Sequence, residues 1–295
     1  MSEAKATPQS APPASSQKTI DSHHHLWDLG VREQPWLAQP GLDVLRRNFL
    51  APDYAAVAAA AGVTASVVVQ TVDLPEETPE LLAVAADSDV IAGVVGWVDL
   101  TAADVAERLA SFGDTGARLV GIRHQVQSEP DPGWLVRPDV LRGLAAVAGA
   151  GLVYDLVITA GQLPAAIAAA EAVPDLRFVL DHLGKPPIAA GDLEPWATDL
   201  RGLAALPNVV AKLSGLVTEA EVGHWQTASL RPYAEVALEC FGADRLMYGS
   251  DWPVCTVAAG YDEVLATARE LTSGLSAAER DAVFAGTAAR VYRLG

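Results

Sequence analysis

Residues 151–182 read GLVYDLVITAGQLPAAIAAAEAVPDLRFVLDH, in which two apolar runs flank an alanine-rich stretch. The runs at 151–158 and 176–182 are nearly continuous in hydrophobic residues rather than alternating, which is typical of strands buried on both faces. The intervening stretch, 163–172, has the length and composition of a helix. We interpret the unit as one strand–helix–strand repeat of a parallel sheet.

The same rhythm extends in both directions along the chain. Further strands are predicted at 19–24, 65–71, 91–98, 118–124, 208–213 and 245–250, and further helices at 52–61, 138–149, 193–206 and 230–241. Eight strands separated by helices form either a closed barrel or a doubly wound open sheet. Neither GxGxxG nor GxxxxGK[ST] follows any predicted strand, so an open nucleotide-binding sheet loses its main support. The sequence therefore predicts an α/β fold, a (β/α)8 TIM barrel that forms a single domain over residues 19–295.

Composition restricts the partners of this domain. The 295 residues carry a formal net charge of -17, which disfavours nucleic acid and anionic membranes because both attract clustered Lys and Arg. The two cysteines, Cys240 and Cys255, lack metal-site spacing and predict reduced thiols in a cytoplasmic protein. Residues 1–18 are rich in Ser, Ala and Pro and have no apolar segment of a secretory signal, so we expect a disordered tail there.

Polar side chains gather where the predicted strands end, which is where a barrel of this kind carries its active site. Five of the six histidines lie at such ends: His23, His24, His25, His124 and His182. Residues two apart on a strand point the same way, so we expect His23 and His25 to face the barrel mouth together and His24 to point elsewhere. The set indicates a functional site rather than a scatter of separately buried histidines.

Asp251 follows the eighth predicted strand, in the segment Gly-Ser-Asp-Trp-Pro at 249–253. It could cap the helix that follows, because Ser and Asp before Pro are typical of helix N-termini. It could also act as a general base or as a metal ligand. Because two histidines are predicted to face it across the barrel mouth, we favour a catalytic role.

At these residues the chain resembles the amidohydrolase superfamily. Within it, the chain resembles the amidohydrolase-related (amidohydrolase 2) branch with sugar lactonases such as L-fuconolactonase and L-rhamnonolactonase. The matching segments are IDSHHHLW at 20–27, GIRH at 121–124, DHLGKP at 181–186, NVVAKLSG at 208–215 and YGSDWP at 248–253. The His-x-His pair alone is a weak signal, whereas the ordered set covers nearly the whole predicted barrel.

The resemblance implies a hydrolase that opens a lactone, a cyclic ester, and most directly a sugar aldonolactone. Asp251 would activate water. His23, His25 and His182 would polarise the carbonyl, either directly or through one divalent metal. The implied partner is therefore a small molecule.

The chain departs from the metal-dependent members of the superfamily at two strands. Those members usually offer Lys or Glu from strand four and His from strand five, whereas this chain offers Arg123 from strand four and Tyr154 and Asp155 from strand five. Arginine cannot bind a cation, so the sequence argues against a two-metal centre. One metal, zinc first, could still be held by three protein ligands: His23, His25 and Asp251. A metal-free site and a single-metal site both stay open.

A further set of strand-end side chains is predicted to contact the substrate: Gln70, Arg123, His124, Tyr154, Lys212, Trp27, Trp97 and Trp252. Each tryptophan could equally be ordinary core. Because Arg123 and Lys212 supply only modest positive charge, we favour a neutral aldonolactone over a charged pyrone or muconate lactone. A metal-dependent decarboxylase of the same superfamily and a non-enzymatic binding barrel are the alternatives. The sequence leaves the oligomeric state open, a homo-oligomer included.

Overall fold

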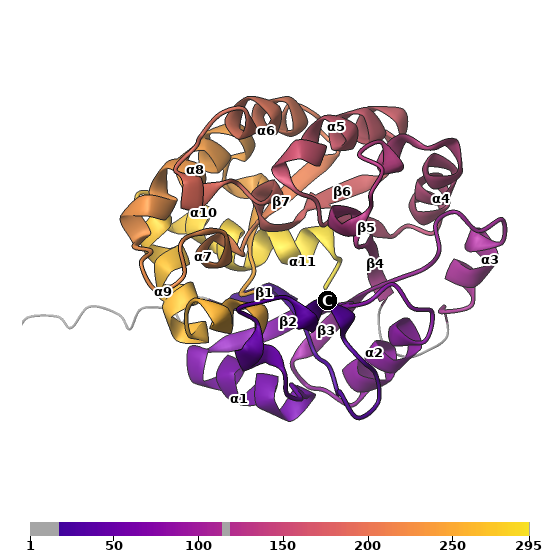
Figure 1. The fold of residues 1–295 in the computed structure, drawn as a ribbon, viewed down its shortest axis with the longest axis horizontal. Helices are drawn as coiled ribbons and strands as arrows, with labels where there is room; N and C mark the ends of the chain where they lie inside the picture. Colours follow the sequence, from indigo (N-terminus) through magenta and orange to yellow (C-terminus); the bar gives the residue numbers. More distant parts are fainter. Residues whose placement is uncertain (1–17, 114–118, 295) are drawn as a thin grey trace, which may run out of the picture.

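Eight parallel strands form the centre of the protein (Figure 1). The computed structural model describes residues 18–113 and 119–294. Each strand pairs in parallel with the next one along the chain. The strands are β1 (Thr19–His24), β2 (Val63–Val69), β3 (Ile91–Gly96), β4 (Leu119–His124), β5 (Val153–Leu156), β6 (Arg177–Leu180), β7 (Val209–Leu213) and β8 (Leu246–Tyr248).

The ring of strands closes between the ends of β1 and β8. The backbone N–H of His25 donates to the carbonyl of Trp252 at 2.7 Å, and the N–H of Asp251 donates to the carbonyl of His23 at 2.8 Å. Both bonds use residues just beyond the end of β8, so the segment that carries Asp251 also closes the barrel. The predicted (β/α)8 barrel is confirmed.

Most of the helices surround the strands on the outside (Figure 1). They are α1 (Ala51–Ala61), α2 (Glu77–Ala86), α3 (Val105–Ala110), α4 (Pro138–Gly149), α5 (Leu163–Ala172), α6 (Trp196–Ala204), α7 (Leu216–Glu219), α8 (Thr227–Phe241), α9 (Tyr261–Leu271), α10 (Ala277–Asp281) and α11 (Thr287–Val291). The helices predicted at 138–149 and 163–172 have the observed bounds, whereas α6 is shorter and α8 longer than predicted. The sequence did not predict α2, α3, α7, α9, α10 or α11.

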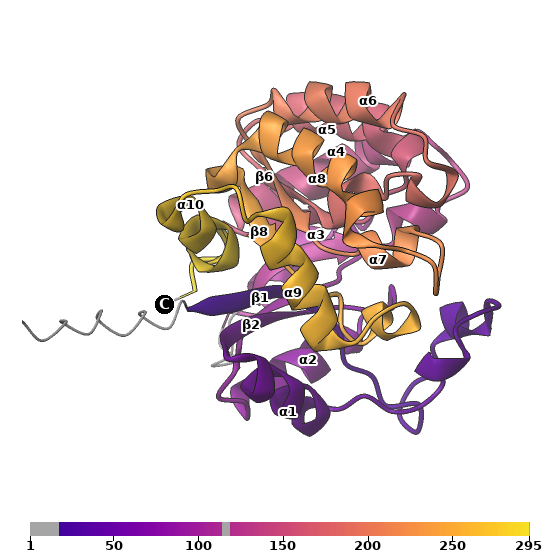
Figure 2. The ribbon, with the colours of Figure 1, turned by 90° about the vertical axis from the view of Figure 1, so that its left-hand side faces the viewer.

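Alternation along the strands sends side chains to two separate layers. One set, which includes Val67 and Val95, fills the barrel interior. The other set, which includes Ile122 and Leu180, packs against the surrounding helices. Helix α11 contacts β1 and β8, and Tyr292 just after it joins the interior set. In the side view the start of β1 and the C-terminal end of the chain lie together at one end of the barrel (Figure 2).

Five strands end two residues earlier than the sequence predicts, namely β2, β3, β5, β6 and β8. The residues that follow leave the sheet and enter the loops of the site. His182 and Asp251, for example, have left-handed backbones with φ of 53° and 57°, which no strand contains. Arg118, predicted to begin the fourth strand, and residues 1–17 of the predicted tail lie outside the described residues.

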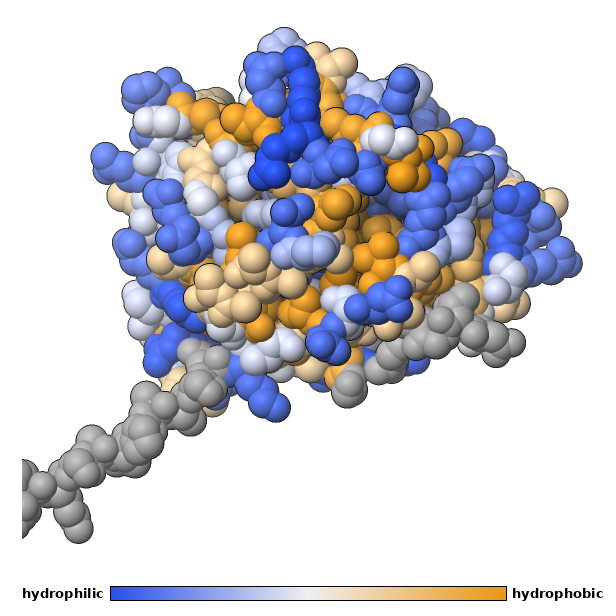
Figure 3. Space-filling model, turned by 90° about the horizontal axis from the view of Figure 1, so that it is seen from below, coloured by the Kyte–Doolittle hydropathy of each residue, from blue (hydrophilic) through white to orange (hydrophobic). Residues whose placement is uncertain are grey.

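The outer surface on the α1 side is mixed in polarity (Figure 3). Hydrophilic side chains lie among weakly and strongly hydrophobic ones (Figure 3), and the exposed positions of α1 include Ala55, Ala56, Ala59 and Ala60. Within residues 18–113 and 119–294, no helix has both the length and the apolar character needed to cross a membrane.

Gly143 and Gly149 of α4 offer a matched pair of substitutions. A methyl group at Gly143 would overlap the backbone of Leu100, whereas a methyl group at Gly149 would meet open space. Because helices prefer Ala to Gly by about 1 kcal/mol, Gly149→Ala should leave the free energy of unfolding unchanged or raise it. Gly143→Ala should lower it by about 1–3 kcal/mol through overpacking. Urea unfolding followed by circular dichroism measures both, and equal stability of the two variants would contradict the close packing of α4 on Leu100.

Candidate active site

A bulge in β1 turns two histidines toward the barrel interior. Between Asp21 and His24 the strand advances three residues while β2 advances two. Asp21 and His24 therefore both point outward to Tyr54 of α1, Asp21 through a hydrogen bond from the tyrosine hydroxyl at 3.1 Å and His24 through a ring stack at 3.5 Å. His23 and His25 point inward, as their spacing predicts, and their Nε2 atoms lie 3.1 Å apart.

The Asp21 carboxylate connects the first strand to the last. It is buried and accepts hydrogen bonds from the backbone N–H of Ser250 at 2.8 Å and from its hydroxyl at 2.6 Å. The hydroxyls of Tyr54 and Tyr261 donate to it at 3.1 and 2.9 Å. The next residue, Asp251, is held in the left-handed region, which costs energy for any residue but glycine. The place of the Asp251 carboxylate is therefore set by the contacts of its neighbour, a role of Asp21 that the sequence did not reveal.

Three imidazoles surround the Asp251 carboxylate. Its Oδ1 lies 3.4 Å from Nε2 of His25, 3.7 Å from Nε2 of His23 and 3.8 Å from Nε2 of His182. All four residues are buried, with at most 5% of the surface of any of them exposed. The structure thus brings together, at the C-terminal ends of the strands, the four side chains that the sequence predicts as catalytic.

The imidazoles of His25 and His182 are oriented through their Nδ1 atoms. Nδ1 of His25 donates to the carbonyl of Val69 at 2.8 Å, so Nε2 of a neutral His25 presents a lone pair. Nδ1 of His182 lies 2.8 Å from the hydroxyl of Ser214. Gly215 has a φ of 68°, and a Cβ at this position would come within 2.6 Å of the His182 ring. Glycine is therefore required here for both the backbone and the close approach.

Burial keeps histidines of the site neutral, while the imidazoles around Asp251 keep it ionised. Burial lowers the pKa of His182 to about 4. Burial, together with the charge of Lys212, also lowers the pKa of His23 well below its usual value. Burial acts to raise the pKa of Asp251, but the neighbouring imidazoles of His182, His25 and His23 outweigh it and hold that pKa well below the usual value.

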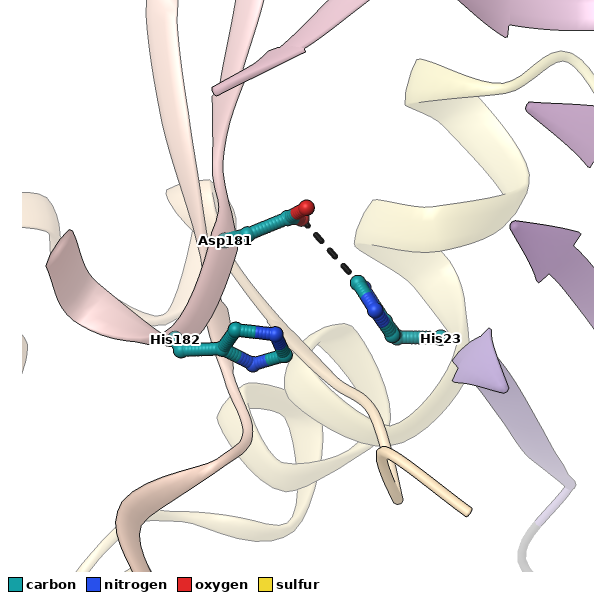
Figure 4. A group of neighbouring side chains, drawn as sticks. All are labelled: His23, Asp181 and His182. Carbon is teal, nitrogen blue, oxygen red and sulfur yellow. Dashed lines mark ion pairs between the residues drawn. The ribbon is translucent and has the colours of Figure 1, made fainter. Parts of the chain in front are cut away.

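A buried group of four charged side chains adjoins the histidines: Arg123, Asp155, Asp181 and Lys212. Lys212 Nζ pairs with Asp155 at 2.5 Å and with Asp181 at 2.9 Å. Arg123 Nη1 donates to Asp181 at 3.0 Å. Asp181 Oδ1 lies 3.3 Å from Nδ1 of His23, and Figure 4 shows these two side chains pointing toward each other beside the ring of His182.

The two carboxylates of this group respond differently to burial. Burial raises the pKa of Asp155 to about 6, even though Lys212 acts to lower it. Burial also acts to raise the pKa of Asp181, but Lys212, His23 and Arg123 outweigh it and hold that pKa well below the usual value. Asp181 is therefore the permanent negative charge next to His23. The sequence did not single out Asp155 or Asp181 as site residues.

Arg123, Gln70 and Lys212 have internal partners instead of the predicted contact with substrate. Arg123 Nη2 donates to the backbone carbonyl of Gln70 and, at 3.0 Å, to its side-chain oxygen. The Gln70 amide donates to Asp73 at 2.9 Å. Arg123 is 2% exposed and Lys212 and Gln70 are fully buried. These side chains therefore help to hold the residues of the site in place through hydrogen bonds.

Tyr154, which the sequence predicts to contact the substrate, faces the surrounding helices in the structure. Tyr154 lies in register with Ile122 and Phe178 in the layer that packs on the helices, and its ring centroid is 6.1 Å from that of Phe178. Its neighbour Asp155 faces the interior instead. Side chains alternate along a strand, so an error of one residue exchanges the two faces.

Trp27 and Trp252 are core residues rather than walls of the site, which corrects the predicted contact with substrate. Both rings pack on Phe49, at centroid distances of 5.1 and 5.4 Å. The indole N–H of Trp27 donates to the carbonyl of Arg47 at 2.8 Å, and Trp252 also contacts Tyr54. The alternative of ordinary core fits both residues.

His124 and Trp97 form a separate, partly exposed group at the strand ends. The indole N–H of Trp97 donates to Nδ1 of His124 at 3.0 Å. Nε2 of a neutral His124 then carries the proton and donates to Glu129 at 2.7 Å. The imidazole stacks on Trp134 at 4.2 Å, so His124 is held rigidly.

The histidine cluster has the spacing of a site for one metal ion. Nε2 of His23 and Nε2 of His25 are 3.1 Å apart, and they lie 3.7 and 3.4 Å from Oδ1 of Asp251. Ligand atoms of a tetrahedral zinc with bonds of about 2.0–2.1 Å lie about 3.3 Å from one another. These three residues could therefore hold a metal ion, and His23, Asp181 and His182 form a second group that could do so.

A parallel barrel whose strand ends carry a His-x-His pair, a third histidine and an aspartate has the architecture of an amidohydrolase. The model of the Amidohydrolase family matches residues 20–294, and the chain belongs to this family.

Several proteins are similar to this chain over nearly its whole length. A protein of Burkholderia multivorans named L-fucono-1,5-lactonase is 44% identical over 286 residues, which cover 93% of this chain and 96% of the relative. A protein of Burkholderia ambifaria with the same name is 38% identical over 279 residues, covering 93% of this chain and 95% of the relative. A crystal structure of an amidohydrolase from Burkholderia multivorans with bound Zn has a TM-score of 0.89 at 42% identity, covering 94% of this chain and all of that chain.

The burial of a neutral His182 makes stability depend on pH. Its pKa of about 4 in the folded protein lies below the value of 6.5 for a free side chain, so the unfolded chain binds the proton first. The stability that this residue contributes is complete above pH 6.5 and is lost as the pH falls toward 4. At 1.36 kcal/mol per pH unit, the loss over this window approaches about 3 kcal/mol. In His182→Asn the free energy of unfolding should therefore fall less between pH 6.5 and pH 4 than in the wild type.

Urea unfolding at a series of pH values measures this difference. His224→Asn is the matched control, because His224 is exposed and lies outside the cluster. The control should keep the acid dependence of the wild type. If His182→Asn kept it as well, His182 would not be a buried neutral histidine.

Proposed function

We propose that the protein hydrolyses a sugar lactone, with Asp251 as the general base. The observation that carries this proposal is the ionised Asp251 carboxylate, which the Nε2 atoms of three histidines surround at 3.4–3.8 Å. The relative named L-fucono-1,5-lactonase, at 44% identity, supports the sugar lactone class and makes that lactone the first substrate to test.

Hydrolysis of a cyclic ester needs an activated water, stabilisation of an oxyanion and a proton for the ring oxygen. Asp251 takes a proton from water as the water oxygen bonds to the carbonyl carbon. When the tetrahedral intermediate collapses, the bond between that carbon and the ring oxygen breaks, and Asp251 returns the proton to the ring oxygen. The product is an open-chain hydroxy acid, and Asp251 is again a carboxylate.

The histidines stabilise the negative charge that develops on the carbonyl oxygen. His23, His25 and His182 direct their Nε2 atoms to the same space beside Asp251. A neutral His23 or His182 with its ring proton on Nε2 donates a hydrogen bond to the oxyanion without adding a charge to the resting site, whereas His25, whose ring proton is on Nδ1, has no proton on Nε2 to donate. Their burial strengthens such a bond because water does not compete for it.

His23, His25 and Asp251 are also the residues that would hold a metal, zinc first. Such an ion, when bound, supplies polarisation of the carbonyl and lowers the pKa of water. An ester is reactive enough for hydrogen bonds from the imidazoles to serve the first purpose. We therefore propose a site that works either with one metal or without any.

The charges around the site favour a neutral lactone. Lys212 is paired with Asp155 and Asp181, and Arg123 is paired with Asp181. A charged pyrone or muconate lactone, or the acidic substrate of a decarboxylase, would need a cation that is free to bind its carboxylate. His124 and Trp97, which are partly exposed, are instead suited to the hydroxyl groups and C–H faces of a sugar.

The cellular setting is part of the proposal. Cys240 and Cys255 are both free thiols, which supports a cytoplasmic location. The net charge of -17 supports a small-molecule partner rather than nucleic acid. We further propose that residues 19–295 act as one domain.

Replacing the general base tests the mechanism. Asp251→Asn keeps the shape of the side chain and removes its ability to take a proton, so kcat should fall by about 10²–10⁴-fold. Asp99→Asn is the matched control, because Asp99 lies near the end of β3 and its side chain bonds only to Thr101 among the described residues. Its kcat should be essentially that of the wild type. Steady-state kinetics with a pH indicator measures both, and near-full turnover by Asp251→Asn would remove Asp251 from the mechanism.

A panel of aldono-1,4- and aldono-1,5-lactones tests the substrate class. We expect the wild-type protein to release acid from L-fucono-1,5-lactone faster than the spontaneous reaction does. A parallel sample with Asp251→Asn protein serves as the reference. Chelator-treated and metal-supplemented samples show whether turnover needs a metal. If no sugar lactone is hydrolysed under either condition, the proposed class is wrong, and charged lactones and aromatic acids become the substrates to examine.

A further inference from the structure

Lys212 is a buried cation in contact with a residue that a metal would need as its ligand. We propose that Lys212 is a positioning residue that keeps the single ring proton of His23 on Nε2, and that it thereby opposes metal binding by His23, His25 and Asp251. The inference concerns the site of the proposed function and rests on that function only for its catalytic meaning.

The surroundings of Lys212 fix the direction of its protons. Its Nζ is fully buried and is 2.5 Å from Asp155, 2.9 Å from Asp181 and 3.0 Å from Nδ1 of His23. The Lys212 ammonium group lies between two carboxylates and can only donate hydrogen bonds. Nδ1 of His23 therefore meets a donor, and a ring nitrogen that accepts a hydrogen bond carries no proton.

The other end of the His23 ring leads to the same assignment. Nε2 of His23 lies 3.1 Å from Nε2 of His25, which is close enough for a hydrogen bond. His25 uses its own ring proton on Nδ1 to reach the carbonyl of Val69 at 2.8 Å, so its Nε2 is an acceptor. The proton between the two Nε2 atoms must then belong to His23. Two independent contacts, one at each ring nitrogen, thus agree.

Asp181 is the competitor of Lys212 for the same atom. Its Oδ1 lies 3.3 Å from Nδ1 of His23 and would accept a proton placed there. The lysine contact is shorter, at 3.0 Å, and has the geometry of a hydrogen bond. The position of one proton on a neutral ring therefore depends on whether a cation or a carboxylate is the partner of Nδ1.

Metal binding requires the opposite arrangement. A metal ligated by Nε2 of His23 needs a lone pair on that atom, so the ring proton would have to move to Nδ1 and face Asp181. A histidine ligand oriented by a carboxylate in this way is the usual arrangement around bound metals. In this chain the move would place an N–H against the Lys212 ammonium. Lys212 therefore favours the form in which His23 donates a hydrogen bond, and disfavours the form in which it binds a metal.

Two further residues, Tyr292 and Arg123, act on this arrangement. Tyr292 donates its hydroxyl proton to Asp155, at 3.0 and 2.9 Å from the two carboxylate oxygens, and so holds the partner that fixes Lys212. Arg123 Nη1 lies 3.3 Å from Nε2 of His23, and because a guanidinium only donates, this contact taken alone favours a lone pair on Nε2; it is longer than the 3.1 Å contact with Nε2 of His25, and the shorter bond of Nη1, at 3.0 Å, goes to Asp181. A guanidinium so close to a would-be ligand adds positive charge that repels a metal ion.

The position of the ring proton can be read directly by NMR. In protein labelled with 15N at histidine, long-range proton–nitrogen correlations distinguish a protonated Nδ1 from a protonated Nε2, and His23→Gln identifies the signals of His23. In metal-free wild-type protein we expect the proton of His23 on Nε2. In Lys212→Met we expect it on Nδ1, because Asp181 is then the remaining partner. A wild-type His23 with its proton on Nδ1 would overturn the proposal.

Zinc titration by calorimetry measures the consequence. Lys212→Met should bind zinc about 10–100-fold more tightly than the wild type, the range typical of changes behind a metal ligand. Lys185→Met is the matched control, because Lys185 is a nearby cation whose Nζ lies 3.7 Å from Glu219 and does not contact His23. The control should leave the His23 proton on Nε2. Equal gains in zinc affinity for both variants would mean that the loss of charge, rather than the proton position, is responsible.

A second variant keeps the test decisive if Lys212→Met fails to fold. Asp181→Asn removes the carboxylate that would accept a proton from Nδ1, so its His23 should keep the proton on Nε2 and its zinc affinity should fall. Unchanged zinc affinity in Asp181→Asn would contradict the proposal. None of these measurements uses a lactone, so a protein with no lactonase activity would leave their outcome intact.

Discussion

The hydrogen bonds between Asp21 and Ser250 are the contact on which the geometry of the site depends. Burying a carboxylate costs free energy unless hydrogen-bond donors surround it. The donors to Asp21 are Ser250 in the segment after β8, Tyr54 of α1 and Tyr261 of α9. A shift of register between the first and last strands would leave Asp21 without Ser250. The same contact therefore closes the barrel in one register and places Asp251 opposite the histidines.

One end of the barrel interior is filled by apolar side chains, and the other end contains buried charged side chains. Valines and Tyr292 fill the end covered by α11, whereas Arg123, Asp155, Asp181 and Lys212 adjoin the histidines. Buried ion pairs add little stability compared with apolar packing, so stability alone does not account for them. Their effect is to fix the charge and orientation of the rings that face the reacting atoms, and His23 is the residue through which they act.

The fold and the centre of the site could be predicted because the deciding residues occupy regular positions along the strands. Contacts between side chains across the barrel could not be read from the sequence. His23, His25, His182 and Asp251 stand out because rare side chains recur at strand ends. Tyr154 was misplaced because a strand buried on both faces carries no polarity pattern that tells its inner side from its outer side. The roles of Asp21, Asp155 and Asp181 depend on partners 31 or more positions away in the chain, such as Tyr54, Lys212 and Arg123. Trp27 and Trp252 have no sequence feature that separates core from site.

The contact between Tyr292 and Asp155 gives the protein an order of assembly. The ribosome makes all eight strands and every residue of the histidine cluster before it reaches residue 292. A nascent chain whose residue 292 is still inside the ribosome can hold its catalytic side chains, but it lacks the hydroxyl that steadies the charge network behind them and the packing of Tyr292 in the barrel floor. The charge network behind the site is thus complete only when residue 292 is in place, which is after all eight strands have been synthesised.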